Sequence, residues 1–270
     1  MELETKYHKL KEILSEIQRP LLAFSGGVDS TFLAGVAAEM KLDLKAITIN
    51  SPFTPEEEIQ EAIELANSLD IEHEIIEIEF KQLGRALKNS PERCYYCKKM
   101  IFSKIKEYAK VENRTVIEGT NQDDQGDYRP GMRALKELGI KSPLFDAGLK
   151  KSGIRKLSAE IGLPTWDKPS LSCLATRVSY NSEITEEKLA KIETAEKYLV
   201  DLGFKQYRVR DHNNLARIEV LPEEREKLFD LEILDELNKK IKELGFDHVT
   251  FDLGGYQSGS MNQSLEVENE

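Results

Sequence analysis

Hydrophobic and polar positions follow two periods along the first part of the chain. Apolar residues recur at helical spacing over residues 3–18, and Pro20 ends that pattern. A short apolar strand at 21–24 is followed by a helix at 30–40, a buried strand at 44–50, an N-capped helix at 54–69 and an alternating strand at 71–79. Strands that alternate with helices in this way predict a parallel sheet.

The pattern changes in the later part of the chain. Residues 81–110 are predominantly helical with an interruption at NSPERCYYC, a strand at 114–121 ends in a polar turn, and helices at 129–140 and 150–162 precede a loop at 163–173. A long helix at 185–203 then leads into a strand pair at 206–212 and 215–220, two further helical segments and a last strand at 248–253. We therefore predict an α/β domain over residues 1–178 and a smaller α+β domain over 179–270.

Composition narrows the class of protein. The 270 residues carry 49 acidic and 38 basic side chains, a formal net charge of -11, which disfavours non-specific binding to nucleic acid. The first residues, MELETKYHKLKEIL, are charged where a signal peptide needs an apolar core, and no apolar run is long enough to span a membrane. We expect a cytoplasmic protein whose three cysteines are reduced thiols.

The string SGGVDST, residues 25–31, stands between a predicted strand and a predicted helix. A glycine pair there lets the backbone approach a ligand closely, and the free amides of a helix start favour an anion. A tight turn with Asp29 or Ser30 as the N-cap is the structural alternative. The string has neither the lysine of G-x-x-x-x-G-K-[ST] nor the G-x-G-x-x-G spacing.

SGGVDS resembles instead the PP-loop of the ATP pyrophosphatases, which split ATP into AMP and pyrophosphate. The resemblance implies an adenine-nucleotide alpha-hydrolase-like parallel sheet and an adenylating enzyme, with Asp29 near a Mg²⁺ ion. It also implies that the pyrophosphate end of ATP is bound by Ser25, Gly26, Gly27, Asp29, Ser30 and Thr31.

Three cysteines provide a second candidate site. Cys94 and Cys97 form a C-x-x-C pair, and Cys173 lies in the loop that ends the first predicted domain. The pair suits one metal, one cluster or a disulfide, and two packed thiols are the structural alternative. Three thiolates can bind three irons of a [4Fe-4S] cluster and leave the fourth open. The competing interpretation is a structural zinc site, completed by one of the four histidines His8, His73, His212 and His248.

Four blocks together resemble the LarE family of ATP-dependent sulfur transferases: FSGGVDSTFLA, PERCYYCKKMIF, GTNQDDQGDYRPGMRALKELGIKSPL and KPSLSCLATRV. YRVRDHNNLARIEVLP and VTFDLGGYQSGSMN extend the resemblance over nearly the whole chain. It implies that the carboxylates of a pyridinium-3,5-dicarboxylate mononucleotide are adenylated and converted to thiocarboxylates, for synthesis of a nickel-pincer nucleotide cofactor. It also implies a homo-oligomer, a hexamer in family members.

The sulfur source divides that family. Members with one cysteine, at the position of Cys173, give up their own sulfur, whereas three cysteines resemble those of tRNA thiolation enzymes with a [4Fe-4S] cluster. All three are present here, so we expect Cys94, Cys97 and Cys173 to hold a cluster that carries sulfide. Thiolation of tRNA or another nucleotide and sacrificial donation from Cys173 are the alternatives.

The remaining candidates flank these motifs. Gly119, Thr120 and Asn121 follow a strand, where the ligand crevice of such a sheet lies, and Asp123, Asp124 or Asp127 either binds metal or orders the loop. Arg208 and Arg210 alternate on one strand and so share a face, which suits a substrate phosphate. By resemblance they belong to a substrate site with Arg177 and Glu219 as neighbours. The expected partners are a small nucleotide and sulfide or a sulfur donor, without membrane or nucleic acid.

Overall fold

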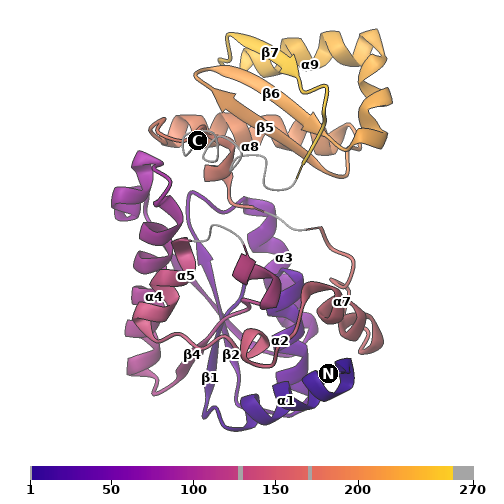
Figure 1. Ribbon diagram of the computed structural model, residues 1–270. Helices are drawn as coiled ribbons and strands as arrows, with labels where there is room; N and C mark the ends of the chain where they lie inside the picture. The colour runs from indigo at the N-terminus through magenta and orange to yellow at the C-terminus, as the bar shows by residue number, and fades with distance from the viewer. Residues whose placement is uncertain (1, 127–129, 170–171, 258–270) are drawn as a thin grey trace. The chain divides into compact units, whose positions relative to one another are not determined.

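The computed structural model describes residues 2–126, 130–169 and 172–257 of the chain, so Asp127 lies outside the described residues (Figure 1). The contacts within the chain divide it into two compact units. The N-terminal unit comprises residues 1–84 and 94–171, and the C-terminal unit comprises 85–93 and 172–270. The sequence pattern placed the boundary at 178 and kept residues 85–93 in the first domain.

A four-stranded parallel sheet forms the centre of the N-terminal unit. Its strands are β1 (Pro20–Ala23), β2 (Lys45–Asn50), β3 (Glu72–Glu77) and β4 (Thr115–Ile117), in the order β3-β2-β1-β4. Every neighbouring pair is parallel, with Leu22 opposite both Ala46 and Ile117. The predicted α/β fold with a parallel sheet is therefore confirmed.

Helices cover both faces of this sheet, because successive side chains of a strand point to opposite faces. Leu22 packs with buried residues of α1 (Leu3–Ser15), α2 (Val28–Glu39), α3 (Glu56–Ser68), α6 (Pro143–Asp146) and α7 (Lys151–Glu160). Leu21, one residue earlier, packs with buried residues of α4 (Arg93–Val111) and α5 (Pro130–Leu138). Figure 1 shows these two helical layers on either side of the strands.

The C-terminal unit is a small α+β fold, as predicted. Strands β5 (Tyr207–His212) and β6 (Leu215–Val220) are antiparallel, and β7 (His248–Phe251) pairs with β6 in parallel. The 3-10 segment η4 (Pro222–Phe229) and helix α9 (Leu231–Glu243) connect β6 to β7. Helix α8 (Glu186–Asp201) packs beside β5, and the short helix η3 (Leu174–Arg177) precedes it in the chain.

The 3-10 segment η1 (Phe80–Lys88) changes direction within the helical stretch predicted from the sequence. Gly84 has a φ of 52°, a left-handed conformation that glycine adopts without steric cost, and the chain passes from one unit to the other at this residue. In the part of the chain that the structure describes, no helix is long and apolar enough to cross a membrane.

Candidate functional site

The strand order places the phosphate-binding candidates at one end of the sheet. Strands β2 and β3 lie on one side of β1 and β4 lies on the other, so the direction of winding reverses between β1 and β4. In open parallel sheets ligands bind outside the carboxyl ends of the strands at such a point. A Cβ atom on Gly119 would lie 3.1 Å from Cβ of Asp29 and 3.2 Å from the amide nitrogen of Ser30. The structure thus brings the segment after β4 against the loop after β1.

The loop after β1 is folded tightly by its own hydroxyl groups. Gly26 has a φ of 65°, and Gly27 is the N-cap of α2, without a side-chain capping bond. The Ser30 hydroxyl donates to the Gly27 carbonyl at 3.2 Å and accepts from the Ser25 amide at 3.3 Å. Neither Asp29 nor Ser30 is the N-cap, in contrast to the structural alternative for this string. The first amides of α2 therefore keep their capacity to bind an anion.

Asp29 carries a buried oxygen atom that has no hydrogen-bond partner among the described residues. Its Oδ2 accepts from Nζ of Lys151 at 2.7 Å, whereas Oδ1 is buried and has no hydrogen-bond partner among the described residues, as is also true of Oγ1 of Thr31. Burial raises the pKa of Asp29, and the charge of Lys151 opposes that rise. Since buried polar atoms are usually paired, these two oxygens point to a ligand, and a carboxylate oxygen is a ligand that Mg²⁺ prefers.

Two lysines that the sequence did not single out lie at this loop. Lys151 begins α7, and Lys168 donates to the Gly26 carbonyl at 3.1 Å and to Glu61 of α3 at 2.5 Å. Arg155 holds the backbone near Lys168, because its guanidinium donates to the Trp166 and Lys168 carbonyls at 2.7 and 2.6 Å. Lys168 lies in the block KPSLSCLATRV, but it is 142 residues from Gly26, so the local sequence carries no signal of this contact.

The turn after β4 is ordered by carboxylates. Glu118 is buried and accepts from the Thr120 amide and hydroxyl at 3.1 and 2.6 Å, so the proton of that hydroxyl is engaged. Asp124 accepts from the Asn121 amide at 2.8 Å. Asp123 accepts at 2.8 Å from the backbone amide of Lys151. The sequence left two roles open for these aspartates, metal binding and ordering of the loop. The described contacts of Asp123 and Asp124 are hydrogen bonds that order the loop.

The cysteines lie at the starts of two helices. Cys94 and Cys97 are in the first turns of α4, where a spacing of three residues makes side chains neighbours on the helix surface. Cys173 is the N-cap of η3. All three thiols are half-buried and outside any disulfide, and within the described residues no group of three or more His, Cys, Asp or Glu side chains is arranged to hold a metal ion.

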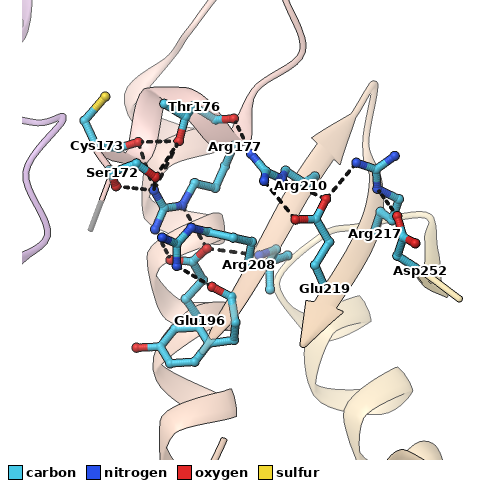
Figure 2. A network of polar contacts seen from close by, with 12 residues as sticks. Ser172, Cys173, Thr176, Arg177, Glu196, Arg208, Arg210, Arg217, Glu219 and Asp252 are labelled. Carbon is cyan, nitrogen blue, oxygen red and sulfur yellow. Dashed lines mark hydrogen bonds and ion pairs between the residues drawn. The ribbon is translucent and has the colours of Figure 1, made fainter. Parts of the chain in front are cut away.

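Arg177 holds the backbone around Cys173 (Figure 2). Its Nε and one terminal nitrogen donate to the two carboxylate oxygens of Glu196 on α8, both at 2.9 Å. The other terminal nitrogen donates to the carbonyls of Ser172 and Cys173, the latter at 3.0 Å. Since both Arg177 and Glu196 are buried, this bidentate pair fixes η3 against α8.

A second bidentate pair joins β5 to β6. Arg210 donates to both oxygens of Glu219 at 3.0 and 2.8 Å and to the Thr176 carbonyl at 2.9 Å. Arg217 donates to the same carboxylate at 2.8 Å and faces Asp252 at 3.4 Å. Glu219 is 1% exposed and pairs with the guanidinium groups of Arg210 and Arg217. These contacts position the two arginines.

Arg208 is buried in a different environment. It has no carboxylate within ion-pair distance among the described residues, and its guanidinium lies 5.1 Å from the ring of Tyr256 and donates to the Tyr207 carbonyl at 2.5 Å. Burial lowers the pKa of Arg208, and the neighbouring Arg177 lowers it further. Among the described residues, Arg177, Arg210 and Arg217 pair with the carboxylates of Glu196, Glu219 and Asp252, whereas Arg208 has no such partner (Figure 2).

Comparison with known proteins gives one family match and several relatives of nearly full length. The asparagine synthase family matches residues 18–104, which run from β1 into α4. The chain is 37% identical to the pyridinium-3,5-bisthiocarboxylic acid mononucleotide synthase of Lactiplantibacillus plantarum, over 97% of this chain and 96% of that protein. The chain belongs to the LarE family. Uncharacterized proteins of Synechocystis sp. and Methanocaldococcus jannaschii are 41% and 36% identical, over 97% and 94% of this chain and 99% and 98% of their own lengths.

Membership of the LarE family makes the chain an ATP-dependent sulfur transferase and confirms the family resemblance drawn from the four sequence blocks. The family match at residues 18–104 covers the loop with Asp29 and both cysteines of the C-x-x-C pair. The synthase match extends through Cys173 and the arginines of β5.

Proposed function

We propose that this chain adenylates the carboxylates of pyridinium-3,5-dicarboxylate mononucleotide with ATP and converts them to thiocarboxylates, a step in nickel-pincer nucleotide synthesis. The observation that carries the proposal is the similarity to a synthase of the bisthiocarboxylic product over almost the entire chain. Two features of the geometry support it: the turn around Asp29 in one unit, and the half-buried Cys173 whose backbone is held by Arg177 in the other.

In the adenylation step, a substrate carboxylate oxygen attacks the α-phosphorus of ATP, the bond from that phosphorus to the bridging oxygen breaks, and pyrophosphate leaves. Ser25, Gly26, Gly27, Ser30 and Thr31 are assigned to the departing pyrophosphate, through hydroxyl groups and the amides at the start of α2. Gly119, Thr120 and Asn121 form the other wall of the nucleotide site. Asp29 fits Mg²⁺ through its unpartnered Oδ1, and the ion supplies charge neutralisation of the phosphates.

For substrate binding, we assign the phosphate of the mononucleotide to Arg208. Its buried positive charge lacks a carboxylate partner in the described residues, and a dianionic phosphate would supply one. Arg177 and Arg210 already bind Glu196 and Glu219, so we assign them to shaping the site and adding positive potential. Glu219 supports Arg210.

For sulfur transfer, Cys94, Cys97 and Cys173 are the proposed ligands of a [4Fe-4S] cluster, since thiolates are the usual protein ligands of such clusters. A cluster held by these thiolates would supply a site for hydrosulfide. Hydrosulfide would add to the carbonyl carbon of the acyl-adenylate, with departure of AMP and loss of the sulfur-borne proton, to give a thiocarboxylate. Arg177 holds the Cys173 backbone during this step.

The proposal includes a cytoplasmic homo-oligomer that takes sulfide from a separate donor. Family resemblance supports a hexamer, which size-exclusion chromatography with light scattering measures directly.

The testing experiment is anaerobic reconstitution of the full chain with iron and sulfide, followed by turnover with Mg-ATP and the dicarboxylate nucleotide. We expect pyrophosphate release and several thiocarboxylates per chain from a brown protein. Cys94→Ala and Cys97→Ala should lose thiocarboxylate formation but retain substrate-dependent exchange between ATP and labelled pyrophosphate.

Two results would contradict parts of the proposal. A colourless wild-type protein that transfers one sulfur per chain and leaves dehydroalanine at position 173 would establish the sacrificial route and remove the cluster. Absence of substrate-dependent pyrophosphate exchange would remove the proposed substrate itself.

A further inference from the structure

The C-terminal unit contains one segment from far earlier in the chain, residues 85–93. This segment includes Asn89 and Arg93. Both side chains are buried, and both donate hydrogen bonds to backbone carbonyls in the segment that follows Cys173. The proposed reaction gives neither residue a role. Their contacts nevertheless converge on the backbone that carries the proposed sulfur-transfer thiol.

Arg93 is 2% exposed, yet its charged side chain donates to neutral acceptors in these contacts. One terminal nitrogen donates to the Ala175 carbonyl at 2.9 Å and to the amide oxygen of Asn89. Its guanidinium also lies 5.5 Å from the ring centre of Tyr180. A charged donor buried on the carbonyl of residue 175 forms a stronger hydrogen bond than a neutral donor would, so it restrains the turn that begins at Cys173.

Asn89 extends the restraint along the same segment. Its side-chain amide nitrogen donates to the carbonyls of Val178 and Ser179 at 3.0 and 2.7 Å, while its backbone carbonyl accepts from the Asn181 amide at 3.0 Å. Asn89 has a φ of 52°, a left-handed conformation that asparagine adopts more readily than most residues. The residue type is thus required twice, for the backbone turn and for the amide contacts.

The Cys173 segment is consequently held from two directions. Arg177, anchored by Glu196, binds the carbonyls of Ser172 and Cys173, and Arg93, anchored by Asn89, binds the carbonyl of Ala175. Arg93 is also covalently bonded to Cys94. The same residue therefore both precedes the C-x-x-C pair in the chain and restrains the turn of the third cysteine.

We propose that Asn89 and Arg93 form a clamp whose function is to position the Cys173 thiol for sulfur transfer. They are positioning residues, because they act through the backbone of residues 175–179. The relevance to catalysis rests on the proposed function, whereas the effect on the thiol does not.

The primary test measures the rate at which iodoacetamide alkylates Cys173 in the metal-free full chain, followed by mass spectrometry of the peptide that contains it. Arg93→Met removes the charged donor and keeps a long apolar side chain. We expect Cys173 to react about tenfold faster, since loss of a charge-assisted hydrogen bond favours opening of the turn by about that factor. Arg93→Lys restores a charged donor and should return the rate toward wild type.

Three further variants keep the test decisive. Asn89→Gly permits the left-handed φ but removes the side-chain amide. It should raise the alkylation rate of Cys173 as Arg93→Met does. The double variant with both changes should react no faster than either single variant, because the two residues act in one clamp. Arg85→Met makes the same chemical change at an exposed position of the same segment and should leave the rate unchanged. Wild-type labelling rates in folded Arg93→Met or Asn89→Gly would overturn the clamp.

Turnover separates the clamp from the proposed function. If both hold, Arg93→Met retains substrate-dependent pyrophosphate exchange, loses thiocarboxylate formation and regains part of it in Arg93→Lys. If labelling responds as expected while wild-type protein shows no pyrophosphate exchange, the clamp stands and the proposed substrate fails. If labelling is unchanged while wild-type protein is active, the clamp fails alone.

Discussion

At the scale of single residues, Asp29 is the most informative side chain of the proposed nucleotide site. A carboxylate loses hydration when it is buried, and the described part of the chain donates a hydrogen bond to only one of the two Asp29 oxygens. Lys151 compensates through a contact at 2.7 Å, and both side chains retain partial exposure. This arrangement lowers the stability of the ligand-free protein. Such a loss of stability is expected of a residue whose role is to bind a ligand rather than to stabilise the fold.

Substitution of Lys151 by methionine should weaken ATP binding. In the ligand-free protein the ammonium group neutralises Asp29, and a bound triphosphate would offer it a stronger anionic partner at the same position. We expect the KM for ATP in pyrophosphate exchange to rise by roughly 10-fold to 100-fold, which corresponds to one hydrogen bond to a charged group. Lys150→Met, at the exposed neighbouring position, is the matched control and should leave KM unchanged.

The same two variants separate binding from stability. A Lys151→Met protein that unfolds at the wild-type temperature but shows the higher KM would agree with a role toward ATP. Equal KM values for Lys151→Met and Lys150→Met would contradict it, and would leave the Lys151 contact with Asp29 as a purely structural ion pair.

Local sequence predicted the residues of the proposed phosphate-binding turn but not the two lysines beside it. Ser25 to Thr31 are consecutive, so their spacing between a strand and a helix is itself a signal. Lys151 and Asp29 are 122 residues apart, and Lys168 and Gly26 are 142 residues apart. Neither contact follows from periodicity, because it depends on where α7 and its following loop pack.

At the scale of elements, paired arginine and carboxylate groups fix the short helix η3 to its neighbours. Arg177 links η3 to α8, and Arg210 links β5 to the Thr176 carbonyl at the end of η3. The alternation of Arg208 and Arg210 predicted a shared face of β5. It did not predict their different partners, which come from α8, β6 and Tyr256.

Replacement of Glu196 by glutamine should destabilise the C-terminal unit strongly. Arg177 would remain buried without its carboxylate, and breaking one side of a buried ion pair costs about 3–5 kcal/mol. Glu187→Gln removes the same charge from an exposed i,i+4 pair with Lys191 on the same helix and should cost less than about 0.5 kcal/mol. Urea unfolding followed by circular dichroism measures both, and equal midpoints would show that the Arg177 pair does not hold η3.

Element types were predictable where periodicity is strong. The parallel sheet and the α+β character of the second unit follow from alternating strands and helices, and the structure confirms both. The sequence predicts residues 81–110 as predominantly helical with an interruption at NSPERCYYC, all within the first domain. The bend at Gly84 and the burial of Asn89 and Arg93 in the other unit arise from tertiary contacts that leave no repeating pattern in the sequence.

At the scale of the whole molecule, each unit contains a histidine whose pKa is lowered. Burial lowers the pKa of His73, which lies 2.8 Å through Nε2 from the Thr48 hydroxyl. That hydroxyl donates to the Phe24 carbonyl, so Nε2 of His73 is the donor. Burial followed by the charges of Arg217 and Arg210 lowers the pKa of His212 in the C-terminal unit.

These shifts predict a loss of stability in mild acid. Above the ordinary histidine pKa of about 6.5, folded and unfolded chains are both neutral at these positions, so neither residue affects the pH dependence. As the pH falls through that value, the unfolded chain binds protons that the folded chain does not, and the free energy of unfolding decreases until the pH reaches the lowered folded pKa. The slope cannot exceed about 1.4 kcal/mol per pH unit for each histidine.

The two histidines should contribute unequally, since the His212 side chain is exposed to solvent and His73 is only partly exposed. His73→Gln keeps an amide donor in place of Nε2 and removes the titrating imidazole. The free energy of unfolding of this variant should therefore depend less steeply on pH than that of the wild-type protein. The comparison covers pH 7.5 to 5.5, about one unit on each side of the ordinary histidine pKa. His212→Asn keeps a polar group in place of Nδ1, near the Ser179 hydroxyl, and should flatten the curve less. A His73→Gln curve parallel to that of the wild-type protein would contradict the assignment. In that case the acid sensitivity of the molecule would have to come from its carboxylates, which lose their ion pairs only at lower pH.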